Sequence, residues 1–254
     1  TSSGNFASTT EVNMADRSLI SGDFISAGYL GNNFISGSLV FTPSRDLPAN
    51  EILVKIATFS TSSYVEIGSA VDPNLFITTW RTTVDNEDIT IPTAGSGYDY
   101  TVTTSDGRTF TNTTGNQSIT FATAGDYDVS ISGTFPRIFF NNVGDKTKII
   151  DIKQWGNIAW TSFSGAFRGC SNLVGNYTDA PDLSGVVVLN NSFRECSVFT
   201  GKVSNWDTSN ITDMGAVFRN CTVFNSDCSS WDTSNVTRMN STFQAARAFN
   251  QDIG

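Results

Sequence analysis

Residues 205–243 read NWDTSNITDMGAVFRNCTVFNSDCSSWDTSNVTRMNSTF, and this stretch contains nearly the same pattern twice. The pentapeptide WDTSN at 206–210 returns unchanged at 231–235, and Phe218 returns as Phe243 after the same interval of 25 residues. A fixed interval of roughly 20 to 50 residues is typical of repeat proteins, in which each repeat is one structural unit that packs on the next. The stretch therefore predicts a stacked architecture.

The same pattern extends through four copies, from about residue 149 onwards. Each copy has a phenylalanine anchor, a small residue three positions later, a large apolar residue three positions after that, and a Trp or Pro twelve positions before the anchor. In chain order these sets are Phe167, Phe193, Phe218 and Phe243; Cys170, Cys196, Cys221 and Ala246; Leu173, Phe199, Phe224 and Phe249; and Trp155, Pro181, Trp206 and Trp231. We expect the anchors, the three cysteines, Trp206 and Trp231 to form the core of the repeat.

The apolar residues within one copy are spaced by three and four positions, which would also fit an amphipathic helix. The segment SDCSSWDTSN argues against a continuous helix, because Asp, Ser and Asn favour turns over helix interiors. We therefore expect a coil with an extended piece at 211–214, a helical or 3₁₀ turn at 218–224 and a return through 228–231. One such coil cannot bury its own apolar side, so neighbouring coils must cover it. Equivalent residues of successive coils then form a column, in which neighbouring residues are about 4.8 Å apart.

All four cysteines lie in the repeat, and two interpretations are open for them. Neighbours in one column would lie near the Cα separation of roughly 4.4 to 6.8 Å that a disulfide permits. However, Ala246 continues the column of Cys170, Cys196 and Cys221, and Cys228 occupies a place that Val203 takes in a sister copy. The sequence therefore favours small buried thiols.

The repeated Asp207 and Asp232, with the neighbouring Ser and Asn residues, also admit two interpretations. Carboxylate and amide oxygens are calcium ligands. The same residue types form turns by accepting hydrogen bonds from their own backbone. We expect turns, and no metal or cofactor site.

Residues before the repeat predict β-structure. Period-two alternation between Gly and Asp-Gly turns indicates strands at 88–91, 98–103, 118–121 and 127–132, which suits a small β-sandwich. Further upstream, strands are expected at 37–41, 52–58 and 64–67. The fold class is thus mainly β, with one or more N-terminal β-sandwich modules followed by a solenoid with about 25 residues per coil. The expected divisions are an extended arm at 1–33, a β-module at 34–78, a sandwich at 79–135 and the repeats at 136–254, with further coils left open.

The residues resemble a known group of proteins. The run FPRIFFNNVGDKTKIIDIKQWGNIAWTSFSGAFRGCSNL, followed by WDTSN-(I/V)-T-x-M and AFNQDIG, is similar to the BspA-like leucine-rich repeat surface proteins of bacteria, whose repeats are of the mycoplasmal-lipoprotein type. The preceding DITIPTAGSGYDYTVTTSDGRTF and FATAGDYDVSISGTFPRI resemble a PKD-like β-sandwich. The resemblance covers about 76–254. This sequence departs from the family pattern at two places. The sandwich has TTSDG where WGDG is more usual, and the second repeat has Pro181 with SGVVVLNNSF in place of the WDTSN form. The resemblance implies a cell-surface or virion-surface interaction protein with no shared catalytic residues.

The composition narrows the function further. The formal net charge is −9, and no cluster of Lys or Arg stands out along the sequence, which argues against a nucleic-acid partner. Histidine is absent, so the commonest general base near neutral pH is missing. No apolar run approaches the length of a membrane helix.

The leading hypothesis is a non-enzymatic, extracellular structural or adhesive protein whose repeat surface contacts other proteins or cell surfaces. Two adjacent rows are the expected contact area: Thr161, Val187, Thr212 and Thr237 in one, and Ser162, Val188, Asp213 and Arg238 in the other. A plain solvated surface is the structural alternative for these rows. A variant of the hypothesis is a self-assembling filament or virion-surface subunit.

Two other functions remain alternatives. A carbohydrate-binding module would use an exposed aromatic side chain, and Trp80 is the candidate because Trp206 and Trp231 belong to the repeat core. An enzyme would use the acidic group Asp85, Glu87 and Asp88, since paired carboxylates can hydrolyse glycosides. A solvated loop explains three acids in four residues, nothing else in the sequence points to a cleft around them, and we expect no catalysis.

Overall fold

A computed structural model describes residues 71–253 of the chain. The chain divides into two compact units, Thr1–Asp72 and Pro73–Gly254, and the second is described here. The predicted arm at 1–33, the three predicted strands at 37–41, 52–58 and 64–67, and all but the last residues of the β-module at 34–78 lie outside the described residues.

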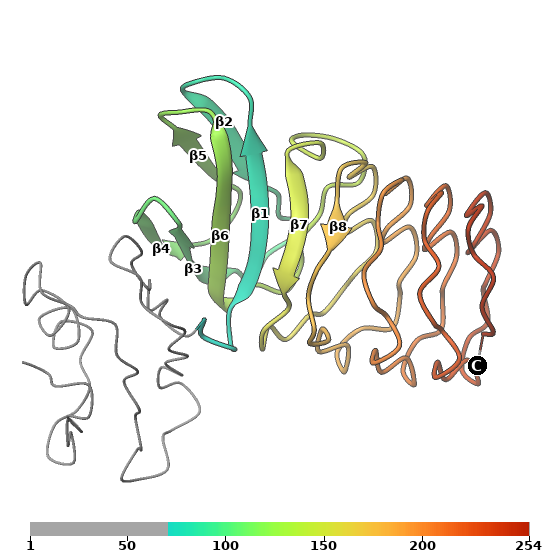
Figure 1. Ribbon diagram of the computed structural model, residues 1–254. Coiled ribbons are helices and arrows are strands. Elements are labelled where there is room, and N and C mark those ends of the chain that lie inside the picture. The colour runs from blue at the N-terminus through green and yellow to red at the C-terminus, as the bar shows by residue number, and fades with distance from the viewer. Residues whose placement is uncertain (1–70, 254) are drawn as a thin grey trace, which may run out of the picture. The chain divides into compact units, whose positions relative to one another are not determined.

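The described residues contain strands and turns but no helix, which confirms the prediction of a mainly β fold (Figure 1). The strands are β1 (Phe76–Thr82), β2 (Glu87–Ile91), β3 (Asp99–Thr104), β4 (Thr109–Thr113), β5 (Gln117–Phe121), β6 (Gly125–Thr134), β7 (Ile149–Gln154) and β8 (Val174–Gly175). Six of them form one sheet in the order β4-β3-β6-β1-β7-β8, and β2 pairs with β5 in a second sheet. All pairs are antiparallel except β7 with β8.

The four strands predicted between 88 and 132 correspond to β2, β3, β5 and β6, with ends that differ by one or two residues. Their alternation reflects burial of one face: in β6, Val129 and Ile131 are buried whereas the residues beside them are not. Strand β1 was not predicted. Its burial runs from Phe76 to Trp80 without interruption, so the strand lacks the polar face that would reveal it as a strand.

Strand β7 joins the β-sheet region to the repeat. It pairs with β1 on one side and with β8 on the other, and β8 lies within the first copy of the 25-residue pattern. The structure therefore places residues 79–135 and 136–253 in one compact unit with a shared sheet.

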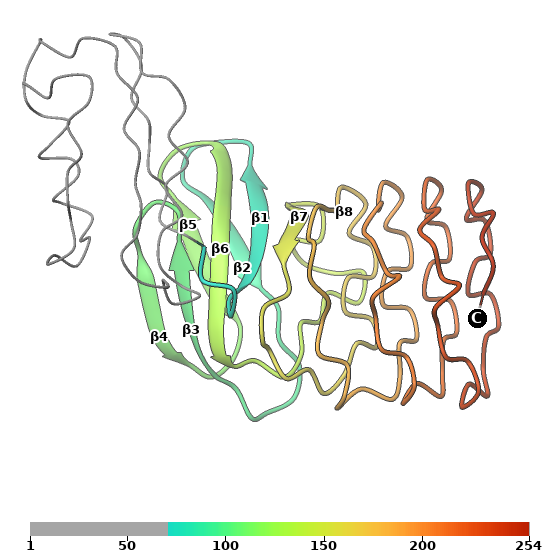
Figure 2. The same cartoon turned by 60° about the horizontal axis from the view of Figure 1, so that its bottom comes forward.

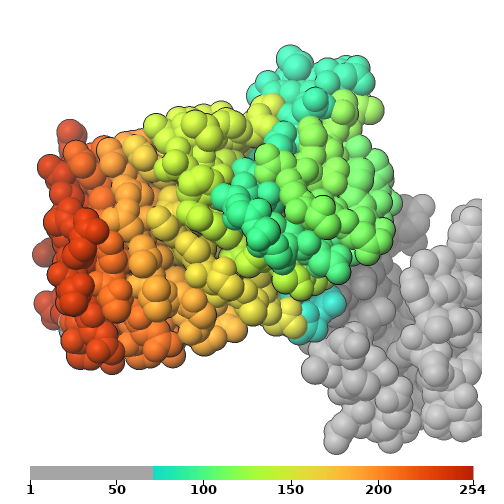
Figure 3. Space-filling model, turned by 180° about the vertical axis from the view of Figure 1, so that it is seen from behind, coloured from blue at the N-terminus to red at the C-terminus, as the bar shows by residue number. Residues whose placement is uncertain are grey.

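In the repeat region, successive copies run side by side as turns of chain (Figures 1 and 2). The backbone N–H groups of Phe167, Phe193 and Phe218 donate to the next copy, to the carbonyl oxygens of Ser192, Val217 and Thr242 at 2.7, 3.0 and 2.9 Å. A partial turn from 136 to 154 precedes the first complete copy, and in it the N–H of Phe140 donates to Ala166. We use "coil" below for each of these turns of chain. Figure 3 shows the coils as consecutive bands from yellow to red.

The predicted helical or 3₁₀ turn at 218–224 is wrong. The segment consists of separate turns, closed by hydrogen bonds from the Cys221 N–H to Phe218 and from the Phe224 N–H to Cys221. A residue in the left-handed region stands on each side of the anchor, namely Ala216 (φ 55°) and Asn220 (φ 63°). Left-handed residues cannot continue a right-handed helix. The expected extended piece at 211–214 is also reduced, to a single bridge residue, Asp213.

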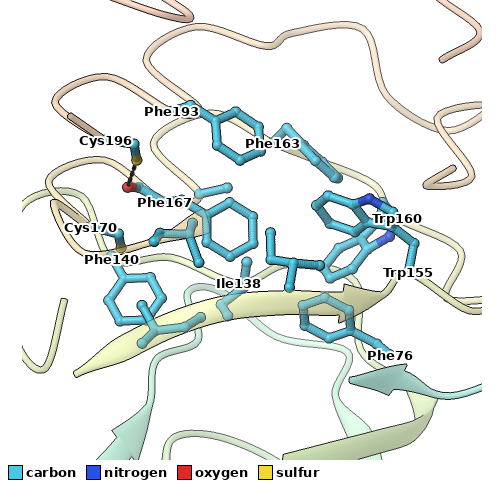
Figure 4. Close-up of a cluster of buried hydrophobic side chains, with 14 of the residues drawn as sticks. Phe76, Ile138, Phe140, Trp155, Trp160, Phe163, Phe167, Cys170, Phe193 and Cys196 are labelled. Carbon is cyan, nitrogen blue, oxygen red and sulfur yellow. Dashed lines mark hydrogen bonds between the residues drawn. The ribbon is translucent and has the colours of Figure 1, made fainter. Parts of the chain in front are cut away.

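The aromatic core is continuous from the sheet into the coils (Figure 4). In the sheet, the Phe76 ring lies 5.6 Å from Trp155 and 5.1 Å from Trp160, between ring centroids. In the coils, the anchor rings of Phe167, Phe193, Phe218 and Phe243 stack in sequence with centroid separations of 5.2, 5.7 and 6.0 Å. Offset stacking at these separations contributes beyond the burial of apolar area.

Candidate interaction surface

The residues expected in the repeat core lie inside the coils. Phe167, Phe193 and Phe218 are fully buried, and Trp206 and Trp231 are nearly so. Phe243 is only partly buried, since it lies in the last coil that the structure describes. These side chains hold the coils together and leave the polar positions to form the surface.

The cysteine positions Cys170, Cys196, Cys221 and Cys228 hold free, buried thiols. The Sγ of Cys196 donates to the carbonyl oxygen of Phe167 at 3.0 Å, and the Sγ of Cys221 donates to that of Phe193 at 2.9 Å (Figure 4 shows the first contact). Burial raises the pKa of each thiol. These groups therefore act as small core side chains with a weak donor.

The first predicted contact row is exposed and internally hydrogen-bonded. The hydroxyl groups of Thr161, Thr212 and Thr237 each donate to a carbonyl oxygen of the preceding coil, at 3.3, 3.2 and 3.1 Å. The acceptors are Pro136, Val187 and Thr212. Because the hydroxyl donors are directed back along the stack, the row presents mostly methyl groups and the side chain of Val187 outward.

The second row is built on parallel bridges between coils. Val188 pairs with Asp213, and Asp213 pairs with Arg238. The Arg238 guanidinium donates to the Asp213 carboxylate at 3.0 Å, and the Arg238 side chain stays 59% exposed. The second carboxylate oxygen of Asp213 accepts from the Gly215 N–H at 2.8 Å. Of this pair, Arg238 is therefore the group available to a partner.

The Asp-Ser-Asn segments form turns. The Oδ1 of Asp207 accepts from the hydroxyl and the N–H of Ser209 at 2.7 and 3.0 Å, and these bonds lower the pKa of Asp207. The Nδ2 of Asn235 donates to the Ser209 carbonyl of the coil before it at 2.8 Å. Residues 71–253 hold no group of three or more His, Cys, Asp and Glu side chains that could bind a metal ion. The carboxylates thus serve the turns.

The acidic group at 85–88 has its carboxylates occupied by neighbours. Glu87 accepts from the Thr83 N–H at 2.6 Å and pairs with Lys148 at 3.0 Å, and these contacts lower its pKa to about 2. Asp85 accepts from the Ala124 N–H, and Asp88 accepts from the Thr120 hydroxyl. A carboxyl with so low a pKa is a poor proton donor near neutral pH. The hydrogen bonds of these carboxylates hold the neighbouring loops in place.

The expectation that Trp80 is exposed is wrong. Only 1% of Trp80 is accessible, because it stands on the central strand β1 with its ring 5.7 Å from that of Phe140 and its Nε1 donating to Thr78. The other four tryptophans are buried as well. No tryptophan ring offers a face on which a sugar could stack.

The structure also corrects the statement that basic residues do not cluster. Arg168, Arg194 and Arg219 each follow a phenylalanine anchor, so the coils bring them into one column. The signal was present in the sequence as an interval of 26 and then 25 residues, but it is invisible to a search for neighbouring basic residues. Within 71–253 there is, in addition, no helix with the length and apolar character needed to cross a bilayer.

Comparison with known proteins gives one family match. Residues 161–254 match a family described as "Mycoplasma protein of unknown function, DUF285". The match agrees with the resemblance to mycoplasmal surface repeats over these residues, and it includes neither a leucine-rich-repeat nor a PKD-like assignment. No curated protein and no solved structure matches the chain.

Proposed function

We propose that this chain is a non-enzymatic, extracellular structural or adhesive protein that displays its repeat surface to other proteins or to a cell surface. In this proposal the coils form a leucine-rich-repeat-like solenoid of about 25 residues per coil, and the preceding sheets are a PKD-like sandwich that carries it. Localisation at a cell surface or virion surface is part of the same proposal.

The supporting observation is a constant backbone that carries variable side chains. The hydrogen bonds between coils recur at equivalent positions, and the threonine hydroxyls of the first row repeat the same contact. In the second row, by contrast, the residue type changes in every coil: Ser162, Val188, Asp213 and Arg238. A regular scaffold with a changing surface suits recognition of a large partner.

A self-assembling form, as a filament or virion-surface subunit, is a variant of the proposal. The last described coil leaves Val236, Met239, Phe243 and Phe249 only partly buried, and Ile253 is 41% exposed. Their equivalents in the coil before are fully buried. Another coil or another subunit would cover these apolar groups.

Binding of the full-length chain to immobilised extracellular proteins, with fibronectin, collagen and the chain itself as probes, tests the proposal. We expect binding to at least one probe, and we expect Arg238→Glu to weaken it at least about tenfold if the second row is the contact. Arg81→Glu is the matched control, because Arg81 is an exposed cation on β1 that also pairs with a carboxylate, Asp126.

Electron microscopy of the same sample tests the assembly variant. Filaments or ordered arrays would support assembly, and dispersed particles that bind a probe would support display without assembly. A chain that stays dispersed and binds none of the three probes contradicts the proposal. Equal weakening of binding by Arg81→Glu and Arg238→Glu would also contradict the proposal, because the contact would then lie outside the second row.

A further inference from the structure

We propose that Arg168, Arg194 and Arg219, here called the arginine column, bind an acidic polysaccharide with carboxylate or sulfate groups on successive sugars. The inference deepens the proposed function by naming a ligand class, and it rests on that function only in placing the chain outside the cell.

The backbone fixes the column. The N–H of Gly169 donates to the carbonyl oxygen of Arg194, and the N–H of Glu195 donates to that of Arg219, both at 2.8 Å. Arg194 therefore stands directly between the other two arginines, at the inter-strand spacing of about 4.8 Å. The backbones of the three arginines thus recur along the coil axis in one register.

Few carboxylates neutralise the column. Among the described residues, Glu195 is the only acidic side chain in ion-pair contact with it, at 3.1 Å from the Nε of Arg194. Arg168 donates to the amide oxygen of Asn141 at 3.3 Å, and the Arg219 guanidinium has no hydrogen-bond or ion-pair partner within 71–253. The Nε atoms of Arg168 and Arg219 are buried without a partner. An external anion can therefore reach only the terminal nitrogens of these guanidinium groups, where it forms charge-assisted hydrogen bonds.

The coil itself does not require arginine at this position. Gln244 holds the equivalent place in the next coil, and its carbonyl oxygen accepts from the Asn220 N–H at 2.8 Å in the same way. A neutral side chain therefore supports the same backbone. The three arginines add an ability that glutamine lacks, which is to bind carboxylate or sulfate through two parallel hydrogen bonds.

The spacing selects the ligand class. Same-face side chains of an extended peptide recur at roughly 6.6 to 6.8 Å, so an acidic peptide would fall out of register after one coil. A polysaccharide with an acid group on each sugar carries its anions at shorter intervals along the chain than such a peptide does. Nucleic acid needs many phosphate contacts, more than a column of three arginines provides.

The surroundings of the column also suit a sugar. Asn141 and Asn191 accept hydrogen bonds from Arg168 and Arg194, so their amide groups lie beside the guanidinium groups. Lys146 extends the basic strip by one coil, since its side chain lies against Gly169 and its Nζ donates to Asn142. Amides can bind hydroxyl groups while the cations bind the acid groups.

Binding of the full-length chain to heparin and to polygalacturonate tests the inference, with dextran as the neutral control. We expect binding to at least one of the two acidic polymers that weakens with added salt. In Arg168→Gln/Arg219→Gln we expect the affinity to fall at least about tenfold, because two charge-assisted contacts are lost. Gln is already the residue at position 244, so the fold is expected to persist.

The matched control is Arg81→Gln/Lys153→Gln, which removes the same charge from exposed ion pairs with Asp126 and Asp128. It should change the affinity by less than about twofold, because exposed pairs contribute little and lie off the column. Equal losses in the two double variants, no binding to either acidic polymer, or equal binding of polyglutamate or single-stranded DNA would each overturn the inference. If the chain binds neither acidic polymer but still binds a protein probe, the polysaccharide inference is contradicted and the proposed function is not.

Discussion

At the scale of single residues, each coil depends on left-handed backbone at two fixed positions. They flank the phenylalanine anchor, as Gly165 and Gly169 in the first copy and as Asn191 and Glu195 in the next. Later copies keep the conformation without glycine, and Ala245 adopts φ 59°. The left-handed region costs a residue with a Cβ atom roughly 1 to 2 kcal/mol. The repeat therefore tolerates local strain in exchange for its turns.

Ala245→Gly is expected to stabilise the last coil. The relief of strain exceeds the entropic cost of glycine, which is roughly 0.5 to 1 kcal/mol, so a net gain of about 0.5 kcal/mol is expected. Ala248→Gly is the control, because Ala248 is also exposed in this coil but has no positive φ. It should lose stability. Urea unfolding followed by tryptophan fluorescence measures both, and a loss in Ala245→Gly would contradict the explanation.

The buried thiols give a second prediction at this scale. Burial raises the pKa of Cys221 and of Cys228 to about 12, so almost no thiolate is present in the folded chain at pH 8. Alkylation by iodoacetamide should be slow in the native protein and fast in urea, as judged by mass spectrometry. Since the unfolded thiols titrate near pH 9, stability should fall as the pH rises from about 9 to about 12. Rapid native alkylation of either cysteine would show that it is not buried.

At the scale of the elements, the anchor column and the sheet differ in how readily the sequence revealed them. The column was predictable because Phe167, Phe193, Phe218 and Phe243 recur at a fixed interval, and an interval survives whatever shape the coil takes. The shape itself was not predictable: steps of three and four suggested a helical turn where left-handed residues produce separate turns. Strand β1 escaped prediction because both of its faces are buried.

The anchor column predicts unequal costs for one substitution at two places. Phe193→Ala should lose about 3 to 5 kcal/mol of unfolding free energy, since the ring is fully buried between Phe167 and Phe218. Phe243→Ala should lose distinctly less, because that ring is only partly buried. Denaturant titration of both variants gives the comparison. Equal losses would mean that the two anchors do not differ in burial as described.

At the scale of the whole described unit, the sheets and the coils share one aromatic core, in which Phe76 of β1 meets Trp155 and Trp160. The sequence suggested an independent sandwich followed by repeats, because each has its own pattern. What joins them is β7, a strand that belongs to the repeat side of the chain and to the sheet of the sandwich side. Such a junction has no repeating pattern in the sequence by which it could be predicted. The same holds for the arginine column, whose members are distant in sequence and adjacent only through stacking.

The stacked architecture requires coils that lie in register, and cross-linking tests this register most directly. Thr212 and Thr237 are exposed, equivalent residues whose backbones are hydrogen-bonded at 2.8 Å. Neighbours in such a ladder have a Cα separation within the roughly 4.4 to 6.8 Å of a disulfide. Thr212→Cys/Thr237→Cys should oxidise almost completely to an intramolecular disulfide, whereas Thr212→Cys/Ser234→Cys, three positions out of register, should not. Equal cross-linking in the two variants, or none in the first, would contradict the stacked register.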